Sequence, residues 1–179
     1  IDALYRMTSG NVSGSRMDLE TFVQRYYLER ILYAANRRFQ EMSAGQFELR
    51  MYDLKKAGEG KNRGLDLMVY STVTGKEREV RTLSGGESFM AALSLALGLA
   101  DLIEQTQSSI HLDVMFIDEG FGSLDEQSRG QAVRVLKEMA GGNKMIGLIS
   151  HVSELKQEME DQLLVTKTET GSHVTWQIS

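Results

Sequence analysis

Cysteine and proline are both absent from the 179 residues of this chain. Without cysteine the chain can form no disulfide, has no thiol nucleophile and cannot hold zinc through thiolates, so it is compatible with a reducing compartment. The lack of proline excludes proline-rich linkers and favours regular helices and strands. Because the chain begins with Ile1 rather than methionine, we expect a processed or excised piece of a longer protein.

Long apolar runs are missing as well. We find none that approaches the roughly 18 residues of a membrane-spanning helix, and no basic-then-apolar signal at the start. The apolar stretch at 89–100 is short, and we interpret it as a buried helix. Hydrophobic residues make up 41% of the chain, enough for the core of one domain or of one lobe of a larger domain. We therefore expect a soluble, cytoplasmic protein without a membrane partner.

Positive charge is not in excess. The formal net charge is −5, which argues against a general nucleic-acid binder but leaves room for a local basic patch. One predicted loop contains four basic side chains, Lys55, Lys56, Lys61 and Arg63. Three more, Lys76, Arg78 and Arg81, follow a little later in the sequence. These side chains are candidate DNA contacts, although a solvated loop and strand edge explain the same charges.

The first part of the chain predicts a long helix and then an antiparallel meander. Apolar residues recur at helical spacing over 17–44, with Gly45 as a stop signal. Alternation at 46–52 and 65–70 indicates two strands, and the turn at Thr74-Gly75 leads into a third at about 78–82.

The second part changes to α/β character. A long helix follows Ser84. The strands at 111–118 and 144–150 have continuous apolar cores, as expected of parallel strands buried on both faces. A helix at 125–140 connects them, and a short helix at 151–160 is followed by strands near 163–168 and 173–178.

Ser84 and Glu87 form a capping box at the start of the long helix, in which each side chain accepts from a backbone N–H. This structural explanation does not require Gly85 and Gly86. A glycine pair at a helix N-terminus leaves its N–H groups bare, so that a phosphate can approach where the helix dipole favours an anion. Both interpretations of the glycines stay open at this point.

Two acids, Asp118 and Glu119, close the first parallel strand. Ligands of open α/β sheets gather at the carboxyl ends of strands. An aspartate there can hold Mg²⁺, and a neighbouring glutamate can take a proton from an attacking water. The alternative is that two acids simply end a strand in solvent.

Two weaker signals follow. Ser123 or Asp125 can cap the next helix, and His151 comes directly after the second parallel strand, again at a carboxyl end. A lone histidine is more often structural than functional. His111 and His173 have no such context and are interpreted as structural.

These elements occur in the order Leu83-Ser84-Gly85-Gly86-Glu87, apolar-apolar-Asp118-Glu119, Ser123-Leu124-Asp125 and His151. The order resembles the C-terminal half of an ATP-binding-cassette (ABC) ATPase, with its signature motif, Walker B motif, D-loop and switch histidine, over residues 82–152. Glycine rather than proline follows the Asp-Glu pair, in the stretch DEGFGSLD. That stretch and LSGGESFMAALSLALGLAD are similar to the SbcC family of DNA-repair ATPases, relatives of the SMC proteins.

The resemblance implies an α/β fold, namely the C-terminal lobe of a P-loop ABC-type ATPase head, with an antiparallel meander, a parallel-sheet α/β unit and flanking helices. Residues 1–45 would form a loop and the helical base of a coiled coil, and residues 46–179 the ATPase lobe. The sequence holds no G-x-x-x-x-G-K-[ST] phosphate loop, since Gly75-Lys76 is followed by Glu77. That loop and the Q-loop would lie in the N-terminal lobe.

The resemblance also implies how ATP is bound. In the family two heads enclose two ATP molecules, so Ser84 and Gly86 would contact the γ-phosphate held by the partner head. Gly85 and Glu87 would shape the turn. Asp125, which lies with Ser123 in the D-loop, would tie the two sites together.

The remaining roles implied by the resemblance concern hydrolysis. Asp118 would hold Mg²⁺, Glu119 would activate the attacking water and His151 would sense the γ-phosphate. The implied partners are the N-terminal lobe, a second head, an SbcD-type nuclease subunit at the base of the coiled coil, and DNA, and the implied location is the cytoplasm at the nucleoid. Alternatives are another SMC-like or recombination ATPase, a transporter subunit, or a non-catalytic lobe that docks a nuclease.

Overall fold

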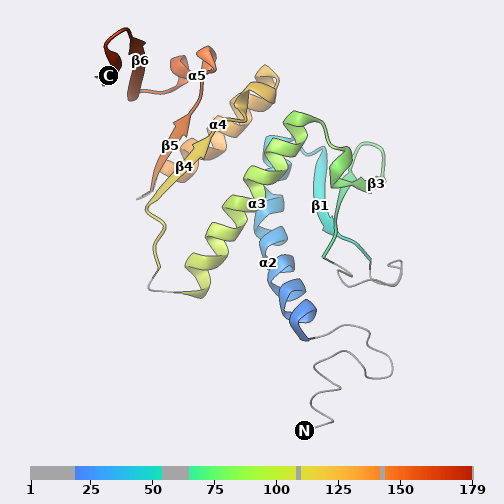
Figure 1. Cartoon of the computed structure of the whole chain (residues 1–179). Coiled ribbons are helices and arrows are strands. Elements are labelled where there is room, and N and C mark those ends of the chain that lie inside the picture. Colours follow the sequence, from blue (N-terminus) through green and yellow to red (C-terminus); the bar gives the residue numbers. More distant parts are fainter. Residues whose placement is uncertain (1–18, 54–64, 108–109, 142–143, 179) are drawn as a thin grey trace, which may run out of the picture.

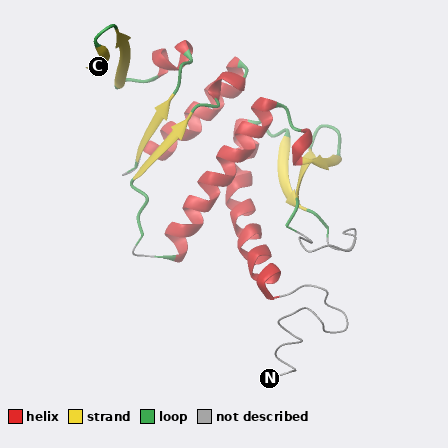
Figure 2. Cartoon of the chain, viewed as in Figure 1, coloured by secondary structure: helices red, strands yellow, loops and turns green. Residues whose placement is uncertain are grey.

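The computed structural model describes residues 19–53, 65–107, 110–141 and 144–178. Two long helices cross at its centre, a small antiparallel sheet lies on one side of them, and a parallel strand pair with its own helix lies on the other (Figures 1 and 2). The predicted α/β class, with meander and parallel unit, is confirmed. Buried apolar side chains from both sides and both long helices form one core, including Leu32, Phe39, Leu49, Val69, Leu97 and Val133.

Helix α2 (Leu19–Met42) ends in a Schellman turn. The Gly45 N–H donates to the Gln40 carbonyl over 2.6 Å and the Ala44 N–H to the Glu41 carbonyl over 3.3 Å. Ala44 and Gly45 both have positive φ, 50° and 75°. The predicted stop is therefore confirmed, although Ala44 takes the left-handed position that usually falls to glycine.

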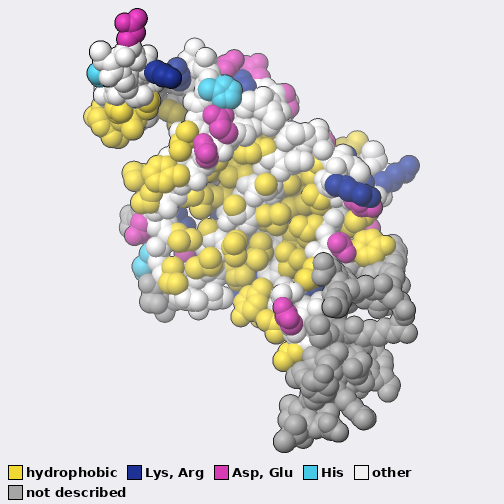
Figure 3. Space-filling view, viewed as in Figure 1, with side chains coloured by type: hydrophobic (Ala, Val, Ile, Leu, Met, Phe, Trp, Pro, Cys, Tyr) yellow, Lys and Arg dark blue, Asp and Glu magenta, His cyan; other side chains and the backbone are white. Residues whose placement is uncertain are grey.

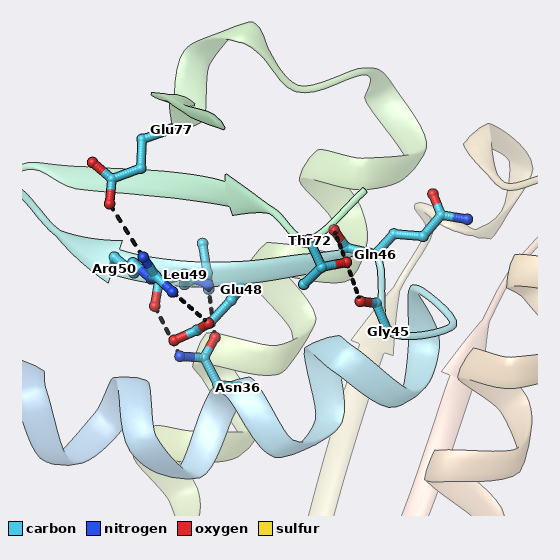
Figure 4. A network of polar contacts seen from close by, with 8 residues as sticks. All are labelled: Asn36, Gly45, Gln46, Glu48, Leu49, Arg50, Thr72 and Glu77. Carbon is cyan, nitrogen blue, oxygen red and sulfur yellow. Dashed lines mark hydrogen bonds and ion pairs between the residues drawn. The ribbon is translucent and has the colours of Figure 1, made fainter. Parts of the chain in front are cut away.

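The meander consists of β1 (Phe47–Met51), β2 (Leu67–Ser71) and β3 (Lys76–Glu79), paired antiparallel in that order. Asn36 of α2 fastens the sheet, because its side chain accepts from the Leu49 N–H over 2.7 Å and donates to the Leu49 carbonyl over 2.8 Å (Figure 4).

The third strand begins and ends earlier than the sequence predicted. Residues Val80–Thr82 form a 3₁₀ turn instead of strand. The Thr82 hydroxyl donates to the Glu79 carbonyl over 2.7 Å, and the Thr82 carbonyl accepts from Arg78 over 2.7 Å. These bonds replace strand pairing and turn the chain toward the next helix.

Helix α3 (Gly85–Thr106) packs along α2. A Cβ on Gly98 would lie 2.7 Å from the Ile31 carbonyl oxygen of α2, so the two backbones approach closely there. Arg38 and Asp101 join the helices through two hydrogen bonds of 2.6 and 3.1 Å.

Helix α3 has 22 residues and is long and apolar enough to cross a membrane by length and composition. The argument from sequence that the apolar stretch is too short was therefore wrong. Half of its most apolar window is buried inside the fold. Core helices of soluble proteins meet the same length and composition test, so its packing against α2 supports its interpretation as a core helix.

Strands β4 (Val114–Asp118) and β5 (Met145–Ile149) are parallel and are connected by α4 (Glu126–Ala140). The expectation that both faces of these strands are buried was wrong. Alternate side chains face outward, and Phe116 and Met145 are 68% and 59% exposed. Within the described residues this sheet has two strands, and the core covers only the face of Met115 and Ile117.

The chain closes with α5 (Ser153–Glu158) and a hairpin of β6 (Gln162–Thr168) and β7 (Gly171–Gln177). The hairpin stands beyond α5, away from the two central helices (Figure 1). Both elements were predicted, with slightly different bounds.

Candidate functional site

The turn at the start of α3 is held by a reciprocal capping box. The Ser84 hydroxyl oxygen accepts from the Glu87 N–H over 3.2 Å, and the Glu87 carboxylate accepts from the Ser84 N–H over 2.7 Å. The box predicted from the sequence is confirmed. Because Ser84 uses a lone pair in this bond, its hydroxyl proton stays available to a ligand. We call residues 84–87 the signature turn.

Glu87 has a second partner that sequence reasoning missed. The Arg78 guanidinium donates to the Glu87 carboxylate over 3.0 Å. Partial burial opposes ionisation of Glu87, but the hydrogen bonds from Ser84 and Arg78 outweigh it and lower the pKa of this carboxyl below its ordinary value of 4.5. The signature turn therefore keeps an anionic brace at neutral pH.

The two glycines of the signature turn have different surroundings. A Cβ on Gly86 would lie 2.7 Å from the Ser123 carbonyl oxygen, closer than packed atoms allow. A Cβ on Gly85 would lie 3.6 Å from the Ser123 side chain, an ordinary contact. Gly86 thus has a structural reason within this chain, which the sequence did not reveal because Ser123 is distant along it. Gly85 has none of comparable strength.

The D-loop residues lie in the connection between β4 and α4. The Ser123 hydroxyl donates to the Gly120 carbonyl over 2.7 Å. Asp125 caps α4, since its carboxylate accepts from the N–H and the hydroxyl of Ser128 over 2.9 and 2.8 Å. These two bonds lower the pKa of Asp125. Of the two residues that the sequence offered as the helix cap, Asp125 is the one that caps α4, and Ser123 closes the preceding turn.

The signature turn and the D-loop share one hollow of about 260 Å³. Its walls include Ser84, Gly86 and Glu87 from one side and Ser123 and Asp125 from the other, and the end of α2 completes it. Two motifs 36 or more residues apart in the sequence are therefore neighbours in space, with Gly86 at the contact.

Asp118 and Glu119 stand at the carboxyl end of β4, as predicted. Glu119 adopts a left-handed conformation with φ 59°, and its N–H donates to the Ile149 carbonyl of β5 over 2.8 Å. A non-glycine residue in this region costs about 1–2 kcal/mol, so the surrounding structure holds it there. The hydrogen bond to the neighbouring strand thus helps to hold the backbone of Glu119 in this conformation.

The structure brings Glu119 and His151 together. The His151 Nδ1 lies 2.9 Å from a Glu119 carboxylate oxygen, and both side chains are largely exposed. Among the described residues no hydrogen bond or ion pair engages the neighbouring Asp118 carboxylate, which is exposed at the end of its strand. The arrangement offers one carboxylate for a metal and one carboxylate–imidazole pair for proton transfer.

An aromatic pair, one ring buried and one partly buried, supports this edge and was not predicted. Phe121 is fully buried, and its ring meets that of Phe89 edge to face at 5.0 Å between centroids. Gly120, with φ 98°, lies so close to Phe89 that any Cβ would collide with the ring. The alternation Gly120-Phe121-Gly122 was the available signal in the sequence.

The basic residues that the sequence offered as DNA contacts have different outcomes. Lys55, Lys56, Lys61 and Arg63 lie outside the described residues. Arg78 is engaged with Glu87, and Arg81 pairs with Glu79. Within the part of the chain that the structure describes, no three His, Asp or Glu side chains cluster as a metal site, so a Mg²⁺ ion at Asp118 would need further ligands from phosphate, water or another lobe.

Solved structures define the class of fold. A chain from work on ATP-driven dimerization and DNA stimulated activation of SMC ATPases superposes with a TM-score of 0.65 at 16% identity, covering 88% of this chain and 89% of that one. The Smc head domain from Pyrococcus furiosus bound to the C-terminal domain of ScpA has a TM-score of 0.64 at 16% identity, covering 89% of this chain and 37% of that one. The fold is that of an SMC-type ATPase head.

Sequence comparison is more specific. Residues 63–138 match the family described as SbcC/RAD50-like, Walker B motif. The chain is similar to the SbcC component of nuclease SbcCD from Lactococcus lactis, with 41% identity over 96% of this chain and 16% of that protein. The same component from Treponema pallidum is 49% identical over 83% of this chain and 14% of that protein. The chain carries the Walker B domain of the SbcC/RAD50-like family, and it spans about one sixth of the length of these relatives.

Proposed function

We propose that this chain is the C-terminal lobe of an ABC-type ATPase head that binds and hydrolyses ATP across a head dimer and so controls a nuclease complex acting on DNA breaks or hairpins. The observation that carries the proposal is the Glu119–His151 pair beside Asp118, at the carboxyl ends of two parallel strands. The curated relatives are named as subunits of a nuclease, which supports the choice of partner.

In this proposal the signature turn meets the ATP of the partner head. The Ser84 O–H and the backbone N–H groups at the start of α3 would donate hydrogen bonds to the γ-phosphate of that ATP. Gly85, without a packing reason of its own, leaves room for that approach, and Glu87 holds the turn. Asp125 and Ser123, which share the hollow with it, would contact the second site.

Hydrolysis falls to the other cluster. Asp118 would hold Mg²⁺, which neutralises charge on the phosphates. Glu119 would accept the proton of the attacking water, and His151 would orient that carboxylate and meet the γ-phosphate. The needed phosphate-binding loop would come from an N-terminal lobe.

The exposed apolar face of β4 and β5 supports the proposal that an N-terminal lobe packs against this chain. Val114, Phe116, Met145 and Ile149 alternate outward on the paired strands and are between 48% and 68% exposed. Figure 3 shows hydrophobic side chains gathered over this side of the molecule. Such a face belongs against another layer of protein. We propose that the N-terminal lobe of the same head covers it.

The remaining partners follow the family. The exposed half of α2 carries aromatic side chains such as Phe22, Tyr26 and Tyr33, which fit a coiled-coil base that contacts a neighbouring helix and a nuclease subunit. A second identical head and DNA complete the assembly, which we place in the cytoplasm at the nucleoid. The division into a coiled-coil base at 1–45 and an ATPase lobe at 46–179 is part of the same proposal.

Steady-state ATP turnover tests the proposal, with this chain mixed with the N-terminal lobe and with each lobe alone as the control. We expect turnover only in the mixture, rising with the square of head concentration at low concentration, because each site needs two heads. A folded mixture without turnover, even with the nuclease subunit added, would instead favour a non-catalytic lobe that docks the nuclease.

A further inference from the structure

Arg78 contacts three parts of the fold at once. One guanidinium nitrogen donates to the Thr82 carbonyl over 2.7 Å, and another donates to the Glu87 carboxylate over 3.0 Å. The same group lies 5.5 Å from the centre of the Phe47 ring. The side chain is about one third exposed, with an exposed fraction of 36%. It thus bridges from the sheet, across the 3₁₀ turn, to the signature turn.

We propose that Arg78 is a positioning residue for the signature turn, which holds Glu87, and through it Ser84, in the orientation that engages the ATP of a partner head. This inference rests on the proposed function for its consequence in the dimer. It assigns Arg78 to the ATP site and removes it from the basic patch that the sequence offered to DNA.

The geometry requires arginine in particular. The planar fork reaches the Thr82 carbonyl and the Glu87 carboxylate at the same time, whereas the single ammonium of lysine has no fixed fork. Glu87 receives two donors, the Ser84 N–H and Arg78, so the arginine restricts the carboxylate that caps the turn. Without Arg78 the carboxylate keeps only the bond from the Ser84 N–H and is less restricted.

The sheet that carries Arg78 is held in place by several contacts. Arg78 belongs to β3, where it pairs with Val69 of β2. The sheet is fixed to α2 through Asn36. Arg50 of β1 pairs with Glu48 of the same strand over 3.0 Å and with Glu77 of β3 over 3.4 Å, so only the second contact ties two strands together (Figure 4). A side chain anchored on such a sheet can define the position of a neighbouring turn.

Arg81 offers a matched control. It has the same charge three residues away, is 81% exposed and pairs only locally, with Glu79. Arg78→Ala and Arg81→Ala remove equal charge from one short segment, so a general electrostatic effect, including one on DNA binding, alters both. An effect of Arg78→Ala alone identifies the contact with the signature turn.

The experiment compares complete heads carrying Arg78→Ala, Arg78→Lys, Arg81→Ala or no substitution. Two quantities are measured: the head concentration that gives half-maximal ATP-driven dimerisation, and the ATP affinity of monomeric heads. For Arg78→Ala we expect the head concentration at half-maximal dimerisation to rise roughly tenfold, the scale of one lost charge-assisted hydrogen bond. The ATP affinity of monomeric heads should not change. Arg78→Lys should recover part of the loss, and Arg81→Ala should match the unsubstituted head.

Dimerisation of Arg78→Ala at the unsubstituted concentration would overturn the proposal, as would equal losses in Arg78→Ala and Arg81→Ala. The pKa of Glu87, followed by NMR in the same heads, supplies an independent readout. It should rise in Arg78→Ala and stay unchanged in Arg81→Ala. If the unsubstituted head fails to dimerise with ATP, the proposed function fails, while an unmoved Glu87 pKa would by itself overturn the brace.

Discussion

Glu119 shows how the backbone positions one candidate site residue. Its left-handed conformation and its N–H bond to Ile149 turn the carboxylate toward His151, which follows the neighbouring strand. Strain at a single residue is tolerated where the surrounding structure holds it, and such strain clusters at functional sites.

Glu119→Gln tests the role of this carboxylate. In a complete head we expect ATP-driven dimers to form normally and ATP hydrolysis to slow by about 10²-fold or more, because the amide cannot accept the proton of water. Turnover and dimerisation are measured together. Glu154→Gln, an exposed acid just beyond His151, is the control and should be unchanged. Normal turnover in Glu119→Gln would remove Glu119 from the mechanism.

Alanine substitutions at Gly85 and Gly86 should have different effects on stability. Gly86→Ala places a methyl group 2.7 Å from the Ser123 carbonyl, so the D-loop must move. We expect the free energy of unfolding, measured in urea, to fall by about 1–3 kcal/mol, the usual cost of overpacking. Gly85→Ala meets only ordinary contacts and should be neutral or slightly stabilising, since alanine favours helices. Equal stability of the two variants would contradict the packing explanation of Gly86.

At the scale of elements, the crossing of α2 and α3 depends on Gly98. Its missing side chain lets α3 approach the Ile31 carbonyl and the backbone of Ala35 in α2. The apolar faces of both helices then meet in the core, with Leu97 fully buried beside the crossing. The position of α3 in turn places the signature turn at its N-terminus.

Gly98→Ala and Gly130→Ala should therefore have opposite effects. Both replace a glycine inside a helix, which by propensity alone gains up to about 1 kcal/mol. At Gly130 of α4 nothing lies within 4 Å of the added methyl group, so we expect that gain in the free energy of unfolding. At Gly98 the clash with α2 should outweigh it and destabilise by about 1–3 kcal/mol. Stabilisation in both variants would show that the helices separate without cost.

At the scale of the whole molecule, the apolar face of β4 and β5 marks where the fold is open. Phe116 lies over Gly147 on this face and is 68% exposed. Sheets of this kind bury both faces when complete, and the continuous apolar runs of the two strands are suited to that arrangement. The sequence prediction of two buried faces was wrong, because the residues that the structure describes provide no second layer on this face.

Phe116→Lys tests the second layer. We expect this chain alone to keep its stability within about 0.5 kcal/mol, as for most exposed positions. Association with the N-terminal lobe, measured by titration, should weaken by about tenfold or more, because a charge enters an apolar contact. Val73→Lys, at a 75% exposed apolar side chain in the β2–β3 turn, is the control and should leave association unchanged. Equal association in both variants would place the N-terminal lobe elsewhere.

The sequence by itself determined the local features of this protein. Periodicity predicted nearly every helix and strand, and the spacing of Ser84 and Glu87 predicted the capping box, because these features depend on residues a few positions apart. The order of the motifs also indicated the family, which the comparisons confirm.

Only the tertiary structure decided what depends on distant contacts. It placed the Ser123 carbonyl against Gly86, the Arg78 guanidinium against Glu87 and the His151 ring against Glu119. It also left one face of the parallel strands open. Local pattern carries no information on which segments meet, since that is set by how the helices and sheets pack around a shared core. For the same reason the sequence could propose candidate site residues but could not show which of them are neighbours in space.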